Sequence, residues 1–137
     1  GKPRLITMGF TSCKFACPRI ISDMQRIEKE LGADADKIGF LFFSFDTEGD
    51  SPAQMKSAKQ ENQLREDRWT FAVSTGPIVR QLAVALDFKF QTVDGFFAHS
   101  NLIALLDAEG NILHREEALG ADIEPTLKAI RQLLQPR

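Results

Sequence analysis

The sequence predicts an α/β fold with a central, mostly parallel sheet, helices on both faces of that sheet, and a hairpin near the carboxyl terminus. Short β-branched and aromatic runs alternate along the chain with longer segments of helical periodicity. Glycine, proline and aspartate recur between these segments, and no repeat, low-complexity tract or linker interrupts them. We therefore expect one domain over residues 1–137.

Five runs have the length and composition of strands: 4–10, 38–45, 69–74, 101–107 and 111–114. The run 38–45 is apolar at nearly every position, which is typical of a strand buried on both faces, so we expect it to be the central strand. The residues between the last two runs, DAEGN, predict a hairpin turn.

Four helices are expected between and after these strands. The first spans 18–31 with one apolar stripe and is closed by Gly32. The second begins after Ser51, where Pro52 and Gln54 complete a capping-box pattern. The third opens at 74–77, and the last runs from about Asp122. We assign Met8 and Met24 to the core, because they lie in a predicted strand and an apolar helical stripe.

This order predicts parallel strands joined by right-handed crossovers, then a hairpin and a covering helix, which is a thioredoxin-like arrangement. Sites in such open sheets form beyond the carboxyl ends of the parallel strands. Residues 11–18, 46–51 and 74–77 follow those ends and are expected to share one edge. Asp46 and Asp50 are interpreted first as turn residues, with a role beside the site as the alternative.

Composition narrows the class of partner. A net charge of −2 provides no basic surface, so we expect no nucleic-acid partner. No apolar run approaches the roughly 18 residues that span a bilayer, and the first residues do not have the layout of a signal peptide. We expect membrane attachment only through an anchor upstream of this chain.

Both cysteines, Cys13 and Cys17, lie in the segment TSCKFACP at 11–18. A disulfide closing so short a loop constrains the unfolded chain little, which argues against a structural staple. Cys17 precedes Pro18 at or just before a helix N-terminus, where the helix dipole favours a thiolate. The pair is compatible with a redox couple, a soft metal-ligand pair, or two inert thiols.

Two histidines are available as further ligands. In a thioredoxin-like arrangement, a loop that normally carries a cis-proline packs against the redox motif; here no proline occurs from 78 to 124, and His99 occupies the expected place. We expect His99 to converge with Cys13 and Cys17, although an ordinary loop histidine remains an alternative. His114 is interpreted as a solvated or rim histidine.

These motifs resemble the Sco/SenC family of thioredoxin-like, copper-binding proteins. The similarity covers TSCKFACP at 11–18, SFDTEGDSP at 44–52, a tryptophan-containing strand, and a histidine-serine pair before LIALLDAEGNIL. Lys14 and Thr47 stand where the family has prolines. The resemblance also implies that the family's opening hairpin and membrane anchor are absent from this chain.

The resemblance implies that Cys13, Cys17 and His99 bind a copper ion, as Cu(I), Cu(II) or both, and that the two cysteines also act as a redox pair. It implies a metallochaperone for the copper-A site of cytochrome c oxidase, working with a copper donor protein in the periplasm or, in a eukaryote, the mitochondrial intermembrane space. Whether the chain is an enzyme stays open. The competing hypothesis is a thiol-disulfide oxidoreductase with no physiological metal.

Overall fold

The computed structural model describes residues 2–11, 16–93, 96–99, 101–118 and 122–135; for residues 16–18, 92–93 and 96–99 it describes the backbone alone.

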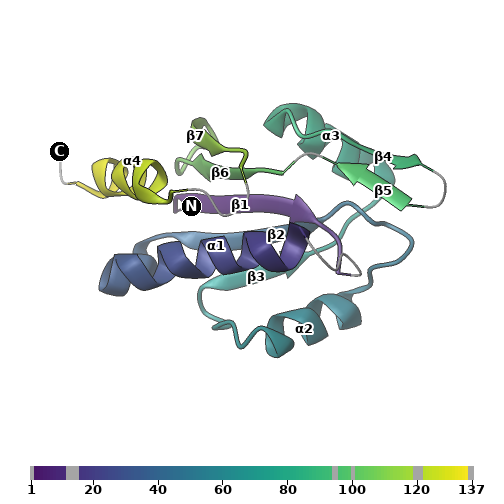
Figure 1. Cartoon of the computed structure of the whole chain (residues 1–137), viewed down its shortest axis with the longest axis horizontal. Coiled ribbons are helices and arrows are strands. Elements are labelled where there is room, and N and C mark those ends of the chain that lie inside the picture. Colours follow the sequence, from purple (N-terminus) through teal and green to yellow (C-terminus); the bar gives the residue numbers. More distant parts are fainter. Residues whose placement is uncertain (1, 12–15, 94–95, 100, 119–121, 136–137) are drawn as a thin grey trace.

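Five strands form one open sheet in the order β3-β2-β1-β6-β7 (Figure 1). β1 (Arg4–Gly9), β2 (Gly39–Ser44) and β3 (Trp69–Ala72) run parallel to one another. β6 (Ile103–Leu106) pairs antiparallel with β1 and with β7 (Ile112–Glu116). The predicted α/β class and the terminal hairpin are confirmed, in a mixed sheet.

The central strand is β1, so the prediction that residues 38–45 form it is wrong. β2 lies inside the sheet, between β1 and β3. A continuous apolar run shows only that a strand is covered on both faces. Such a run does not show which strand will pair with β6. In the structure β6 pairs with β1, at Arg4, Leu5 and Ile6.

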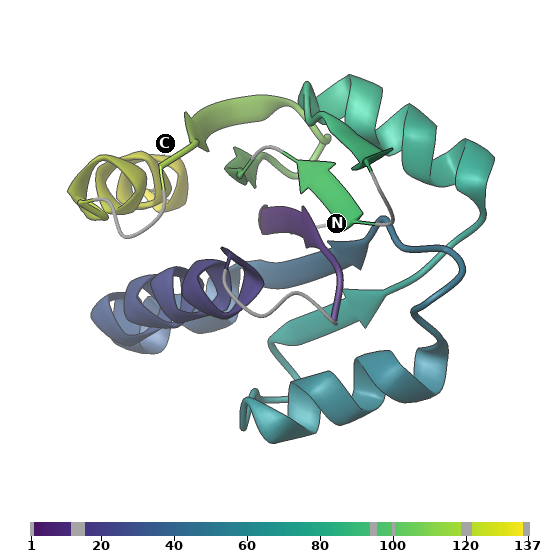
Figure 2. The ribbon, with the colours of Figure 1, turned by 45° about the vertical axis from the view of Figure 1, so that its right-hand side comes forward.

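Alternate side chains of β1 enter two cores on opposite faces of the sheet. Leu5 packs in the core beneath α1 (Ala16–Leu31) and α4 (Glu124–Leu134), whereas Ile6 and Met8 pack beneath α3 (Gly76–Leu86). Figure 2 shows α1 and α4 on one side of β1 and α3 on the other. Helices therefore cover both faces, and Met8 and Met24 are core residues as predicted.

The predicted start of the second helix and the predicted end of the first are confirmed, whereas the first helix begins at Ala16, two residues before the predicted start. α2 (Pro52–Glu61) begins with the expected capping box: the Gln54 backbone N–H donates to Ser51 Oγ at 3.2 Å, and the Ser51 N–H donates to Gln54 Oε1 at 3.0 Å. α1 ends at Leu31 and is followed by Gly32, whose φ of +57° is the left-handed conformation that glycine adopts readily. A 3₁₀ helix, η1 (Gly32–Lys37), follows it.

A second, two-stranded sheet lies where the sequence predicted a loop. β4 (Phe90–Val93) pairs antiparallel with β5 (Phe96–His99), and Phe90 is opposite His99. The strands have only four residues each, too few for a clear alternating pattern. The Asp94-Gly95 dipeptide between two runs rich in aromatic and β-branched residues is a hairpin signal that could have found them.

Candidate metal centre

The segments expected to form the site follow the carboxyl ends of β1, β2 and β3. β1 leads through Phe10 to Thr11, and Cys17 lies in the first turn of α1, as predicted. Cys13 and Lys14 lie outside the described residues, and the side chains of Cys17 and His99 are likewise outside the description. The described residues contain no group of three histidine, cysteine, aspartate or glutamate side chains that could hold a metal ion.

Asp50 connects the chain after β2 to the chain after β1. Its carboxylate accepts a hydrogen bond from the Thr11 backbone N–H at 3.0 Å, a second from the Thr11 hydroxyl, and a third from the Ser44 hydroxyl at 2.5 Å. Asp50 is only 7% exposed. Asp50 is a turn residue as predicted, since its N–H donates to the Asp46 carbonyl, and its carboxylate in addition holds the residue that opens the cysteine segment.

Asp46 is likewise a turn residue, as predicted. Its Oδ1 accepts from the Gly49 N–H at 2.8 Å, and its carbonyl accepts from the Asp50 N–H at 3.1 Å. A Cβ at position 49 would lie 2.2 Å from Asp46 Oδ2, so any other residue there would have to displace the Asp46 carboxylate. The Asp46 N–H donates to Ser44 Oγ at 3.1 Å, and the Ser44 hydroxyl thereby bridges the turn and the Asp50 carboxylate.

An aromatic cluster joins the same end of β1 to the β4–β5 hairpin. The Phe45 ring lies 5.2 Å from that of Phe10 and stacks on that of Phe90, with ring centroids 4.7 Å apart. Phe88 packs against both Phe45 and Phe90. Because Phe90 pairs with His99, these rings fix the backbone of the His99 strand beside the end of β1 (Figures 1 and 2).

His114 differs from the solvated side chain expected of it. It lies on β7 opposite Leu105 and is half-buried, and its Nε2 is buried with no hydrogen-bond partner among the described residues. Residues directly opposite on an antiparallel pair share one face of the sheet. Leu105 belongs to the core beneath α1 and α4, so His114 faces that side.

Asn101, two residues after His99, was not among the residues predicted to form the site. Its Oδ1 is a buried acceptor that has no partner in the described ranges. No sequence pattern marks it, because its burial depends on the packing of the β5–β6 connection.

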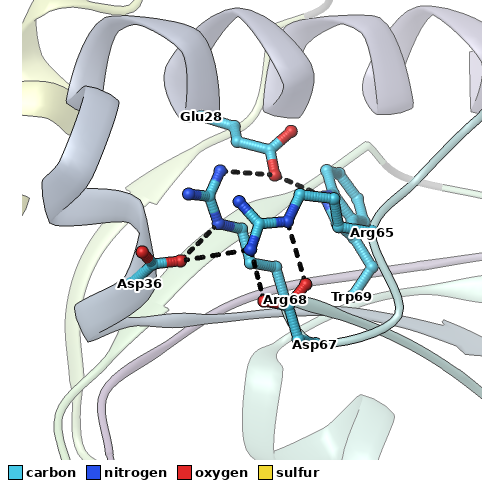
Figure 3. A network of polar contacts seen from close by, with 6 residues as sticks. All are labelled: Glu28, Asp36, Arg65, Asp67, Arg68 and Trp69. Atoms are coloured by element: carbon cyan, nitrogen blue, oxygen red, sulfur yellow. Dashed lines mark hydrogen bonds and ion pairs between the residues drawn. The ribbon is translucent and has the colours of Figure 1, made fainter.

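The main network of charged side chains lies at the opposite end of β3 (Figure 3). Arg68 donates to Asp36 at 2.7 Å and lies 3.5 Å from Glu28, which also accepts from the Trp69 indole N–H at 3.0 Å. The Arg68 hydrogen bond is the main reason that the pKa of Asp36 is lowered, and the same bond raises the pKa of Arg68. Arg65 likewise lowers the pKa of Asp67. This network joins α1 and η1 to the amino end of β3, away from the cysteine segment.

None of the described helices has both the length and the apolar character needed to cross a bilayer.

Comparisons with known proteins agree with this architecture. The SCO1/SenC family model matches residues 1–135. A SCO1 protein homolog of Bacillus subtilis is 34% identical over 71 residues, a match that covers 52% of this chain and 37% of that protein. The match thus spans little more than a third of that relative's length.

Two solved structures have the same fold. The copper-bound ScoI of Bradyrhizobium japonicum is 26% identical, with a TM-score of 0.79 over 98% of this chain and 86% of that one. BsSco, described as a cytochrome c oxidase assembly protein with a disulfide switch, is 20% identical, with a TM-score of 0.81 over 96% of this chain and 80% of that one. On the family match, the chain belongs to the SCO1/SenC family.

Proposed function

We propose that this chain binds one copper ion through Cys13, Cys17 and His99 and transfers it to the copper-A site of cytochrome c oxidase. Two thiolates and one imidazole form a soft donor set, which suits copper and not Mg²⁺ or Ca²⁺. Copper is the cargo in this proposal. Three protein ligands leave room for an incoming ligand from the partner, which suits transfer by ligand exchange.

The observation that carries the proposal is that two sets of contacts hold the end of β1, one to the chain after β2 and one to the β4–β5 hairpin. Asp50 holds Thr11, two residues before Cys13, and the rings of Phe10, Phe45 and Phe90 hold the strand that ends in His99. The backbone before Cys13 and the backbone of the strand that ends in His99 are thereby held at the same end of the sheet. The N-terminal position of Cys17 in α1 favours its thiolate, the form that binds metal.

The same cysteines support a second activity, reduction of the disulfide at the target's copper site. The Cys13 or Cys17 thiolate would attack a target sulfur and form a mixed disulfide, which the other cysteine would resolve. Two thiols of this chain would be oxidised to a disulfide as the target disulfide is reduced to two thiols, so the electrons balance. One solved relative is described as copper-bound and another as having a disulfide switch. These descriptions support proposing both copper binding and disulfide exchange.

The proposed setting is the outer face of a membrane. We propose that the chain, as one domain, faces the periplasm, or the intermembrane space in a eukaryote, with attachment supplied by a segment outside residues 1–137. The proposed partners are a copper donor protein and the oxidase subunit that carries the copper-A site.

A Cu(I) competition titration of the reduced protein tests the ligand set. Wild type should bind one equivalent, Cys17→Ser should lose at least 100-fold in affinity, and His99→Ala should lose about tenfold or more. His114→Ala serves as the matched histidine control and should bind copper as wild type does. Equal affinities for His99→Ala and wild type would remove His99 from the site.

The same variants separate the two activities. Disulfide exchange with a model disulfide should survive His99→Ala and be lost in Cys17→Ser. A wild-type protein that exchanges disulfides but binds no copper would favour the oxidoreductase without a physiological metal.

A further inference from the structure

α3 has an apolar face that no described residue covers. Val84, on this face, is 81% exposed. Pro77, Arg80, Gln81 and Val84 line a hollow of about 430 Å³ on this outer side. We call these four residues, which share one side of the helix, the α3 face: Pro77, Arg80, Gln81 and Val84.

Packing on the other side of α3 prevents this face from turning inwards. Val79, Ala83 and Leu86 are buried in the core against the sheet. Arg115 of β7 donates hydrogen bonds to the Leu86 and Asp87 carbonyls at the end of the helix. These contacts hold the buried side and the last turn of the helix in place, so Val84 stays exposed in the folded protein.

Arg80 is the only charged residue of α3, whose sequence GPIVRQLAVAL contains no aspartate or glutamate. Arg80 forms no ion pair with any of the described residues. Its Nη1 lies 3.3 Å from where a Cβ on Gly76 would be, so the guanidinium folds back over the first turn. The helix dipole is positive there and does not offset the charge. A carboxylate from another molecule would complement it.

The first turn of α3 lies at the same end of the sheet as the segments of the proposed copper site. α3 begins four residues after the last residue of β3, at the carboxyl ends of the parallel strands. Thr11 and Asp50 lie at the same ends of β1 and β2. A partner that reaches the cysteine segment from this end of the sheet therefore comes close to the first turn of α3.

We infer that the α3 face is the docking surface for the protein that accepts copper, and that the acceptor contributes a carboxylate flanked by apolar side chains. This inference rests on the proposed function. The carboxylate pairs with Arg80, and Pro77 and Val84, which lie three residues before and four residues after Arg80 on the same side of the helix, bury apolar surface beside the pair. Surrounding apolar contacts exclude water from such a pair and strengthen it.

The test is an NMR titration of the reduced, metal-free chain with the metal-free soluble copper-A domain of the same organism's oxidase. Arg80→Glu should raise Kd at least tenfold, and Val84→Glu should raise it several-fold. Arg131→Glu is the matched control, because Arg131 is an exposed arginine on α4, at the opposite end of the sheet in Figure 1. It should bind as wild type does, and wild-type binding should weaken as salt is raised.

Two results would overturn the inference: equal Kd values for Arg80→Glu and wild type, or no binding of the domain by the wild type. Cu(I) titration of the same proteins keeps the proposed function separate, since Arg80→Glu should retain wild-type copper affinity. A loss of copper affinity in Arg80→Glu would also overturn the docking role. Failure of the wild type to bind copper would count against the proposed function, while the docking titration could still be interpreted.

Discussion

The Asp50 carboxylate accepts hydrogen bonds from both the backbone N–H and the hydroxyl of Thr11, 39 positions away in the sequence. The Ser44 hydroxyl donates a third. These bonds make one buried carboxylate the connection between the end of β2 and the start of the cysteine segment.

Asp50→Ala should destabilise the protein by about 2–4 kcal/mol, because the buried Ser44 hydroxyl and the two part-buried donors of Thr11 lose their acceptor. Asp50→Asn should cost less, since the amide oxygen still accepts and the Thr11 hydroxyl can accept from the amide. Urea unfolding of the reduced, metal-free protein measures both values. If Asp50→Ala cost no more than about 0.5 kcal/mol, the carboxylate would not be the connection described.

The same variants test the link from Asp50 to the proposed site. Asp50→Ala should weaken Cu(I) binding when affinity is measured without urea, where the variant is still folded. The reason is that Thr11 no longer fixes the segment that leads to Cys13. Asp107→Ala is a suitable control: it removes an aspartate that accepts from the Glu109 and Asn111 amides in the β6–β7 turn. Its copper affinity should equal that of wild type.

Gly49→Ala should destabilise the protein by about 1–3 kcal/mol, because the new methyl group would displace the Asp46 carboxylate from its turn. In an Asp46→Ala background the same change should cost much less, since the atoms it meets are gone. A double-mutant cycle by urea unfolding measures this coupling. Additive costs would show that the two positions do not interact.

Phe45→Leu should weaken copper binding, because it loosens the stacking between the end of β1 and the His99 strand. Phe42→Leu is the matched control: Phe42 is equally buried and stacks on Phe71, in the other core. Both changes should destabilise the protein by about 1 kcal/mol. Only Phe45→Leu should lower copper affinity, and equal affinities would argue against the aromatic link.

The Asp36–Arg68 pair predicts a specific acid sensitivity. Arg68 lowers the pKa of Asp36 below its usual 3.8, so the folded state binds this proton more weakly than the unfolded chain does. The stabilisation is therefore complete above pH 3.8 and is lost as pH falls through the lower, folded-state pKa. When Tm is measured from pH 6 to pH 2.5, the Tm of Asp36→Asn should fall by less than the Tm of wild type. Parallel curves would exclude the pair as a contributor.

Most of the local structure could be predicted from the sequence. Periodicity and end signals located the four helices, the capping box at Ser51, the glycine after α1 and the position of Cys17 at a helix start. These features depend on residues within a few positions of one another, and local patterns report them well. The burial of Met8 and Met24 followed from the same periodicity.

How these elements pair depends on the assembled tertiary structure. The strongly apolar character of β2 gave no sign that β1, and not β2, would meet β6. The four-residue strands of the second sheet were too short for a periodic signal. Thr11 is 39 positions from its partner Asp50, and Phe90 is 45 positions from Phe45, on which it stacks. Contacts over such separations depend on the assembled sheet, and no local pattern encodes them.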